Sequence, residues 1–430
     1  MTDQLVALLG GKEVGHVHRD ARGRLTFVYD DDWRQMPDAY PLSLSMPLAA
    51  AEHRPAVVEA FLWGLLPDNE LVLSRWAQKF QISARNVFAL ISNVGEDCAG
   101  AVQFVLPSRL EAIRSGKQDK IDWLDEKDIA ERLRTLREDH AAWRLPRDTG
   151  QFSLAGAQPK TALLFKNGRW GIPSGRIPTT HILKPPTGRF DGHAENEHIC
   201  LALARSLGLP TAQSKVMRFE KEIAIAVERY DRQRSGNEIL RVHQEDMCQA
   251  LGIMPTIKYQ NEKGPSAADI VALLRTHSSE RETDVDTFVS AIGFNWLIAG
   301  TDAHAKNYSL LIGSGPRIRL APLYDLASIL PYDEFDMHKV KLAMKVGGEY
   351  LLRQIGVRQW QKFAKEMRVD SDRLIAGLGA MAANLPDAIN DARKHAHEDG
   401  LDRAVIDRLV ARMNERITEC VKTLAFRGKA

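Results

Sequence analysis

The chain has 430 residues, more than one hydrophobic core usually serves, so we expect two or three domains or lobes. Apolar residues make up 44% and charged residues 27% of the chain, which is typical of a soluble globular protein. With 58 basic and 56 acidic residues the formal net charge is +2, so the overall charge gives no sign of nucleic-acid binding, although a local basic patch is compatible with it.

The lack of an expected signal peptide or membrane span and the wide spacing of the cysteines both favour a protein of the cytoplasm. The N-terminus lacks a basic region followed by a long apolar stretch, so we expect no signal peptide. No run of about 18 apolar residues occurs, so we expect no membrane span. The cysteines lie far apart in apolar or helical contexts, which predicts buried thiols rather than a disulfide framework or a zinc knuckle. They are Cys98, Cys200, Cys248 and Cys420.

In chain order, residues 1–107 predict a small subdomain of short strands with one or two helices. Residues 24–30 alternate between apolar and polar side chains, as a half-buried strand does. The Pro-Asp-Asn sequence at 67–69 is a start signal for the helix predicted after it. Residues 108–150 are highly charged and helix-like over 123–138, which predicts a helical segment connecting two parts of the molecule.

Residues 151–235 predict a nucleotide-holding lobe made of a sheet and one helix. The Asn-Gly pair at 167–168 separates two strand patterns and suits the positive φ angles of a tight hairpin turn. Further strands are predicted at 181–184 and 222–231. Between them, apolar residues at helical spacing predict a helix over 194–208.

Residues 236–430 predict a mostly helical lobe. One apolar stripe runs along a predicted helix over 285–299 and stops at Gly300. Two short strands around a turn follow within 308–322, and the chain is almost wholly helical from Leu351 onward.

The sequence GTDAHAKNYSLL at 300–311 carries the strongest chemical signal. Asp302 and Asn307 have the spacing of the catalytic aspartate and the metal-binding asparagine of protein kinases. An irregular loop can aim the Asp302 carboxylate at an acceptor hydroxyl while the Asn307 amide oxygen reaches Mg²⁺. Asp325 follows a predicted hairpin and can supply a carboxylate, and Mg²⁺ binds few carboxylates together with phosphate oxygens and water. The sequence therefore predicts ATP and Mg²⁺ as cofactors.

Each of these residues also has a structural interpretation. Asp302 can cap a turn, and Asn307 can satisfy backbone groups at the start of a strand. The ordered set with Asp325 on helix, loop and hairpin favours catalysis. We expect His304 to orient the loop through a hydrogen bond, and Lys306 is a candidate for stabilising the transferred phosphoryl group.

A kinase also needs a cation and backbone donors for the ATP phosphates. Lys184, at the end of a predicted strand, is the candidate cation, and Glu197 is its candidate partner, with Glu195 as a competitor. A strand-end lysine and glutamates on a solvated helix face are the structural alternatives. The loop FSLAGAQPK at 152–160 has small residues that let backbone N–H groups approach phosphate, but it matches neither G-x-G-x-x-G nor a Walker A sequence.

Seven motifs occur in the order seen in HipA-type serine/threonine kinases, the toxins of bacterial toxin–antitoxin pairs. They are FSLAGAQPKTALL, THILKPP, NEHICLALARSLGLP, AVERYDR, HQEDMCQALG, GTDAHAKNYSLL and LAPLYDL. GLLPDN and GEDCAGA are similar to the family's N-terminal subdomain. The resemblance implies an α+β, two-lobed protein-kinase-like fold with a small mixed α/β N-terminal subdomain and a mostly helical C-terminal lobe.

The resemblance also implies a role for each candidate residue. Asp302 would be the catalytic base, and Asn307 and Asp325 would be the Mg²⁺ ligands. The implied nucleotide contacts come from the 152–160 loop, a strand end, a hinge that reads adenine through its backbone and one tyrosine beside the nucleotide. They are Ala155, Gly156, Ala157, Gln158, Lys160, Lys184, Glu228, Arg229, Tyr230 and Tyr324.

Ser153 matches the serine that such kinases phosphorylate on themselves, after which ejection of its loop disables ATP binding. The chain departs from the family at Pro159, where an acidic residue often follows the glutamine. A proline stiffens the loop and removes an N–H donor, which bears on how freely the loop flips.

The resemblance implies partners as well. Family members typically phosphorylate an aminoacyl-tRNA synthetase, glutamyl-tRNA synthetase being the known type, and so arrest growth. A small helix-turn-helix antitoxin of the HipB type restrains them and carries the complex onto operator DNA; a homodimer within that complex is left open. Two alternatives stay open: a small-molecule kinase of the aminoglycoside or lipid type, and a DNA-bound co-repressor scaffold with vestigial kinase activity.

Overall fold

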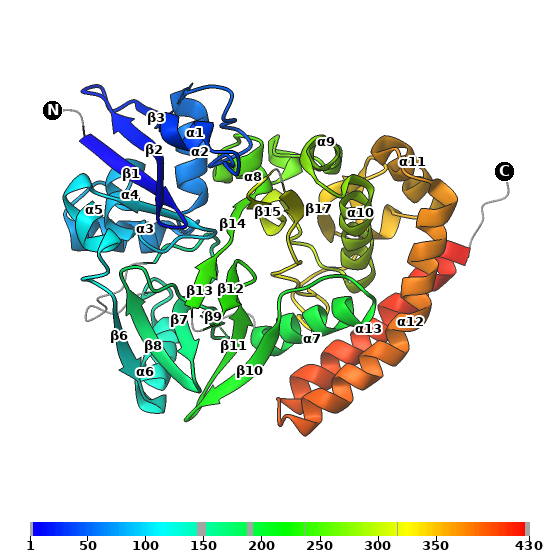
Figure 1. Cartoon of the computed structure of the whole chain (residues 1–430). Coiled ribbons are helices and arrows are strands. Elements are labelled where there is room, and N and C mark those ends of the chain that lie inside the picture. The colour runs from blue at the N-terminus through cyan, green and yellow to red at the C-terminus, as the bar shows by residue number, and fades with distance from the viewer. Residues whose placement is uncertain (1–2, 144–151, 187–191, 237, 316, 426–430) are drawn as a thin grey trace. The chain divides into compact units, whose positions relative to one another are not determined.

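Figure 1 shows a computed structural model of the chain, which describes residues 3–143, 152–186, 192–236, 238–315 and 317–425. The chain forms two compact units, each built from segments that are discontinuous in the sequence. Unit 1 comprises Met1–Pro185, Met217–Thr256 and Ser309–Ala321, and unit 2 comprises Pro186–Val216, Ile257–Tyr308 and Pro322–Ala430.

Unit 1 begins with an antiparallel five-stranded sheet of order β4-β3-β2-β1-β5. Its strands are β1 Asp3–Leu9, β2 Lys12–Arg19, β3 Leu25–Tyr29, β4 Glu52–His53 and β5 Val102–Val105. The side chains of β3 alternate between buried and half-buried, so the strand predicted from this pattern is confirmed.

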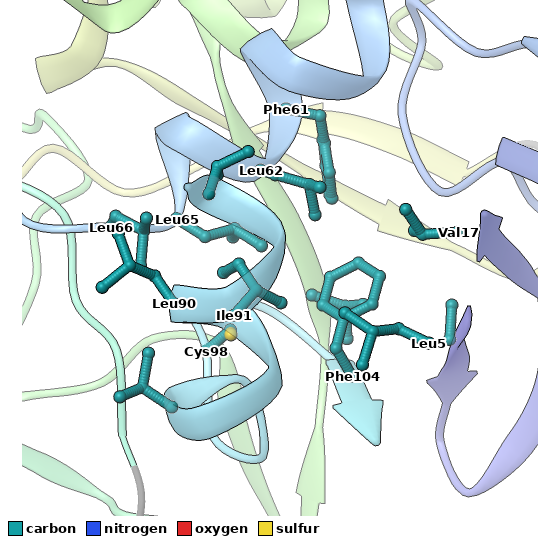
Figure 2. Close-up of a cluster of buried hydrophobic side chains, with 14 of the residues drawn as sticks. Leu5, Val17, Phe61, Leu62, Leu65, Leu66, Leu90, Ile91, Cys98 and Phe104 are labelled. Carbon is teal, nitrogen blue, oxygen red and sulfur yellow. The ribbon is translucent and has the colours of Figure 1, made fainter. Parts of the chain in front are cut away.

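Helices cover this sheet and share its core. They are α1 Asp31–Gln35, α2 Pro55–Gly64, α3 Glu70–Phe80, α4 Val87–Val94 and α5 Pro107–Arg114. Figure 2 shows how Phe61 and Leu62 of α2 and Ile91 of α4 lie among side chains from the strands, such as Phe104. The predicted start of α3 is confirmed, because the Asn69 side chain accepts hydrogen bonds from the first-turn N–H groups.

The second sheet of unit 1 has six strands in the order β10-β11-β9-β7-β8-β6. Five of them are β7 Thr161–Lys166, β8 Arg169–Ser174, β9 His181–Lys184, β10 Ser214–Phe219 and β11 Glu222–Glu228. Asn167 and Gly168 join β7 to β8 with φ angles of 52° and 75°. The tight turn predicted from the Asn-Gly pair is therefore confirmed.

Residues 108–150, predicted to be a helical connection, contain a strand as well. β6 (Lys120–Leu124) is the edge strand of the sheet and pairs with β8. The predicted helix is shorter than expected and starts later, as α6 (Glu126–Glu138), which packs Leu133 against the sheet. An edge strand without a fully buried side chain has little alternation from which to predict it. Residues 144–150 lie outside the described part of the chain.

The remaining elements of unit 1 form two small sheets and a short helix. They are the pair β12 Arg232–Ser235 and β13 Glu238–Arg241, the sheet of β14 His243–Asp246, β15 Ser309–Gly313 and β16 Arg317–Leu320, and α8 Met247–Ala250. The strands predicted within 308–322 are confirmed.

Unit 2 is mostly helical. Its α-helices are α7 His193–Ser206, α9 Ala267–His277, α10 Arg281–Ile298, α11 Val357–Met367, α12 Ser371–Glu398 and α13 Arg403–Ala425. Trp296 of α10 meets Trp360 of α11 edge-on, with ring centroids 5.6 Å apart, in the core between these helices. A hairpin of β17 (Lys341–Val346) and β18 (Glu349–Leu351) was not predicted.

The four-part division at residues 107, 150 and 235 stays a prediction, although α7, expected in the sheet lobe, falls in unit 2. All four cysteines are buried thiols, as expected. Across the described ranges, no helix is both long and apolar enough to cross a membrane.

Candidate active site

The loop that carries Asp302 starts from a fixed helix end in unit 2. α10 is buried along its last turn, and Ala299 ends it in the left-handed region with a φ of 54°. Gly300 then turns the chain, and its N–H donates to the Asn295 carbonyl at 2.7 Å. A side chain at this position would lie 2.2 Å from Asn295 Oδ1, so only glycine fits here.

The loop is closed by its own hydrogen bonds. The Asn307 side-chain amide donates to the Asp302 carbonyl at 2.7 Å, and the His304 N–H donates to the same oxygen at 2.8 Å. Asn307 Nδ2 is thus tied to the loop backbone, and its Oδ1, on the opposite side of the planar amide, points away from that contact. The two residues predicted from their spacing are held in one rigid turn.

The Asp302 carboxylate is 67% exposed, whereas the His304 beside it is buried. The hydroxyl of Tyr259 donates to Asp302 Oδ1 at 2.6 Å, and His304 Nε2 lies 3.9 Å from the same oxygen. The Tyr259 ring packs edge-on against His304, with centroids 4.8 Å apart. Tyr259 was not predicted, because a tyrosine 43 positions before its partner leaves no local spacing signal.

A second segment of unit 2 is tied to the loop. The Tyr324 hydroxyl donates to the carbonyl of the buried Lys306 at 2.7 Å. Asp325, the next residue, is half-buried and has a φ of 55°, an uncommon conformation for a residue other than glycine. Such backbone strain persists where the surrounding structure imposes it, and it gathers at functional sites.

Helix α7 fixes the chain that follows Asp325. Asn196 Nδ2 donates to the Ser328 carbonyl at 2.7 Å, and Asn196 Oδ1 accepts from the Ser328 N–H at 3.1 Å. The Ser328 hydroxyl donates to the Ile298 carbonyl at the end of α10. The end of α10 therefore helps to position both acidic segments, and α7 fixes the segment after Asp325.

The chemistry of these donors fits Mg²⁺. Asn307 and Asp325 offer an amide oxygen and a carboxylate, which are hard oxygen ligands, and the amide nitrogen of Asn307 is already engaged with the loop. Asp302, His304, Lys306 and Asn307 lie in one loop, and Tyr324 is bonded to that loop.

In unit 1, the 152–160 loop is braced from two sides. Gly156, with a φ of +100°, accepts a hydrogen bond from the Asp68 N–H at 3.0 Å. Lys160 Nζ donates to the Ala155 carbonyl at 2.7 Å and would lie 2.6 Å from a Cβ at position 156. The positive φ angle at position 156 therefore requires the single glycine of the loop. Lys160 holds the loop backbone through its hydrogen bond to Ala155. Ala157 is exposed and Gln158 half-buried.

Ser153 lies at the start of this loop and is fully buried. Its hydroxyl donates to the Leu65 carbonyl at 2.7 Å, and its N–H donates to the Asp97 carbonyl at 2.9 Å. The buried side chains of Phe152 and Leu154 flank it. In this conformation the hydroxyl is closed to any other reactant.

Lys184 is buried at the end of β9 and pairs with Ile225 of β11, so it is not an exposed strand-end lysine. Glu195 and Glu197 of α7 are buried too, so the interpretation of a solvated helix face is wrong. Because Lys184 belongs to unit 1 and the glutamates to unit 2, the Lys184–Glu197 ion pair stays a prediction.

The structure places the predicted hinge residue Arg229 in a structural role. Its N–H donates to the Thr180 carbonyl at 2.9 Å, and its carbonyl accepts from the Arg232 N–H at 3.2 Å. Its guanidinium is buried and pairs with Asp231 at 2.8 Å and Asp97 at 3.5 Å. Its backbone and side chain thus make contacts in the interior of unit 1, and the adenine contact expected of this segment stays a prediction.

This buried cluster of charges was not predicted. Burial by itself would raise the pKa of the Asp97 carboxyl, but Arg232, Arg241 and Arg229 outweigh that effect and hold the pKa well below its usual range. Of the other two hinge residues, Glu228 is exposed at the end of β11, and Tyr230 bonds through its hydroxyl to Gln244.

Two family models match the chain. The HipA-like C-terminal domain matches residues 152–389, and the HipA N-terminal domain matches residues 5–105. The chain belongs to the HipA family. Y4mE of Sinorhizobium fredii is 38% identical over 367 residues, which make up 84% of this chain and 84% of that protein. The serine/threonine-protein kinase toxin HipA of Shewanella oneidensis is 29% identical over 397 residues, 89% of this chain and 87% of that protein.

A solved structure of the HipA family is similar over nearly the whole length. It is the Shewanella oneidensis complex of HipA, HipB and operator DNA, with a TM-score of 0.83, 26% identity and coverage of 98% of both chains. The predicted α+β kinase-like fold is therefore confirmed. The prediction that the chain is a serine/threonine-protein kinase of the HipA family is confirmed as well.

Proposed function

We propose that this HipA-family kinase uses ATP and Mg²⁺ to phosphorylate serine or threonine on a protein, and that it acts as the toxin of a toxin–antitoxin pair. The observation that carries the proposal is the closed loop at the end of α10. In it, the Asp302 carboxylate is exposed while the Asn307 amide is fixed against the Asp302 backbone. Phosphoryl transfer to a protein requires both a base that reaches the acceptor hydroxyl and a fixed metal ligand.

Each residue of the loop then has a task. Asp302 would orient the acceptor hydroxyl and take its proton, and Asn307 and Asp325 would hold the metal. Mg²⁺, when bound, neutralises the charge on the phosphates. The buried Lys306 and His304 would keep the loop in shape, and Lys306 would add positive charge near the transferred group.

The nucleotide contacts in unit 1 follow from the loop and the sheet. We assign the phosphates to Lys184 and to the backbone of Ala155, Gly156, Ala157 and Gln158, with Lys160 as a brace. The backbone of the segment Glu228, Arg229 and Tyr230 would read the adenine, with Glu228 and Tyr230 as the first candidates because the Arg229 N–H and carbonyl already make hydrogen bonds. Tyr324 would lie beside the nucleotide.

The partners are proposed from the relatives. The Shewanella structure contains HipA with HipB and operator DNA, which supports a HipB-type helix-turn-helix antitoxin and operator DNA as partners of this chain. An aminoacyl-tRNA synthetase, glutamyl-tRNA synthetase first, is the proposed substrate, and the cytoplasm is the proposed location.

The proposal is tested in growing cells by comparing the wild-type chain with Asp302→Ala. We expect the wild-type chain to arrest growth and to produce new phosphoserine or phosphothreonine sites, and the variant to do neither. A loss of several orders of magnitude in phosphoryl transfer is expected, because the base position is removed. Comparison of the two phosphoproteomes identifies the substrate.

Equal phosphorylation by both chains at equal abundance would contradict the role of Asp302. Growth arrest without any new phosphoprotein, accompanied by a phosphorylated metabolite, would favour a small-molecule kinase instead. Operator binding without transfer by the wild-type chain would favour a scaffold.

A further inference from the structure

Tyr259 lies outside the loop of residues 300–307, which we call the catalytic loop. It contacts the carboxylate of Asp302, the catalytic base of the proposed function. Tyr259 lies between the short 3-10 turns Pro255–Ile257 and Gln260–Glu262, and its hydroxyl donates to Asp302 Oδ1 at 2.6 Å. The Asp302 side chain is 67% exposed, so packing alone constrains it little. The terminal torsion of an aspartate is soft, so a short hydrogen bond is the means of fixing the plane of this carboxylate.

The Tyr259 side chain is itself firmly held. Its ring packs edge-on against the buried His304, at an interplanar angle of 81°. Its carbonyl accepts hydrogen bonds from the N–H groups of Glu262 at 3.0 Å and Gly264 at 2.9 Å, which close a tight turn. A Cβ at Gly264 would lie 2.1 Å from the Ile257 carbonyl, so the close approach of the backbone in this turn requires a glycine.

The turn is also fastened to its surroundings on both sides of Tyr259. The Lys258 carbonyl accepts from the Ala305 N–H, within the catalytic loop, at 3.4 Å. On the other side, Gln260 Oε1 accepts from the Lys345 N–H of β17 at 2.7 Å. The residues on either side of Tyr259 are therefore hydrogen-bonded to the catalytic loop and to β17, and these contacts hold Tyr259 next to Asp302.

We propose that Tyr259 is a positioning residue for phosphoryl transfer, whose hydroxyl fixes the Asp302 carboxylate in the orientation that meets the acceptor hydroxyl. The inference rests on the proposed role of Asp302. The alternative is that the Tyr259 hydroxyl occupies the position of the substrate hydroxyl. Tyr259 would then block the site and have to move away before the substrate binds. The fastened turn favours positioning, because leaving the site would break the hydrogen bonds of its whole frame.

The test is Tyr259→Phe, which removes the hydroxyl and keeps the ring against His304. We expect kcat for the protein substrate to fall about tenfold, since a misaimed base reduces the fraction of productive encounters, with the KM for ATP unchanged. The matched control is Tyr350→Phe, a half-buried tyrosine of β18 in the same unit, whose ring keeps its contact with Lys345 Nζ when the hydroxyl is removed and which should keep the wild-type kcat. The thermal midpoints of both variants should stay within a few degrees of wild type.

Three results overturn the inference. An unchanged kcat in Tyr259→Phe shows that the hydrogen bond has no role in transfer. An increased kcat shows that Tyr259 blocks the position of the substrate hydroxyl. A fall in kcat together with a raised KM for ATP and a lowered thermal midpoint shows a merely structural role.

Asp302→Asn separates this inference from the proposed function. If Asp302→Asn keeps wild-type turnover, the role of Asp302 fails and the inference falls with it. If Asp302→Asn is inactive while Tyr259→Phe turns over at the wild-type rate, only the inference fails. In the double variant we expect no loss beyond that of Asp302→Asn, because a positioning group has nothing left to position.

Discussion

The residues of the catalytic loop differ in solvent exposure, and the differences agree with the role proposed for each residue. Asp302 is 67% exposed, which its proposed role toward a hydroxyl on another protein requires. His304 and Lys306 are buried and shape the loop from within, and Asn307 is half-buried with its amide on the Asp302 carbonyl. A carboxylate at the protein surface keeps its charge at little cost, whereas burial would favour its protonated form.

Glu245 of β14 shows the opposite case and makes the stability of unit 1 depend on pH. Burial raises the pKa of this carboxyl from 4.5 to about 8, although hydrogen bonds from the Ser43 hydroxyl at 2.5 Å and the Leu44 N–H at 2.8 Å act in the other direction. Between these two values the folded chain keeps a proton that the unfolded chain has released. The free energy of unfolding therefore falls as the pH rises through this window, by at most about 1.4 kcal/mol per pH unit.

We predict that Glu245→Gln flattens this dependence, because the amide is neutral in both states and can still pair with Ser43 and Leu44. Its thermal midpoint should exceed that of the wild type at pH 8 and change less between pH 5 and pH 8 in thermal unfolding. Glu238→Gln, on an exposed glutamate of β13, is the control and should keep the wild-type slope. A wild-type slope in Glu245→Gln would refute the assignment.

At the scale of elements, the end of α10 determines where the catalytic loop begins. Gly300→Ala would place a Cβ 2.2 Å from Asn295 Oδ1, and the Asn295 side chain is buried and bonded to the Ala291 carbonyl at 2.9 Å. The backbone must move instead. We predict a loss of roughly tenfold to a hundredfold in kcat, because small displacements of a catalytic group are costly.

The control for Gly300→Ala is Gly377→Ala in α12. Gly377 is exposed and a Cβ there meets no atom within 4 Å, so the change should leave kcat intact and stabilise the helix by up to about 1 kcal/mol. Steady-state kinetics and thermal unfolding of both variants check the pair. Wild-type kcat in Gly300→Ala would show that the loop does not depend on this contact.

The 152–160 loop contains the buried Ser153, and its burial makes phosphorylation depend on movement of the loop. Ser153 is fully buried, so its phosphorylation requires the loop to leave its place, and a bulky, doubly charged phosphate does not fit the buried position that the hydroxyl occupies. We predict that Ser153 becomes phosphorylated with ATP and Mg²⁺ and that the loop then becomes sensitive to proteases. Mass spectrometry measures the first and limited proteolysis the second, with Ser153→Ala as the control. Active enzyme carrying only unmodified Ser153 would disprove the prediction.

Elements with strong local patterns were predicted well, and those fixed by distant contacts were not. The turn at 167–168, the helix start after Asn69 and the Asp302–Asn307 loop each depend on residues close in sequence. β6 was missed because an exposed edge strand alternates weakly. The buried ion pair of Arg229 with Asp97 was not predicted, because the two residues lie far apart in the chain and no local pattern reveals the contact.

At the scale of the whole molecule, the residues with proposed roles are divided between the two units. Unit 2 contains the loop with Asp302 and Asn307 and the segment with Asp325, and unit 1 contains Lys184 and the 152–160 loop. Both units are assembled from distant segments of the chain, so the sequence order of the motifs does not by itself predict which of them fold together. Membership of the HipA family agrees with both sets of residues being present in one chain.

The most direct test of the account is a crystal structure of the chain with a non-hydrolysable ATP analogue and Mg²⁺. We predict that the metal binds the Asn307 amide oxygen and the Asp325 carboxylate, with the γ-phosphate next to it and Asp302 facing the side from which an acceptor would approach. A nucleotide bound elsewhere, or a metal that touches neither Asn307 nor Asp325, would contradict the account.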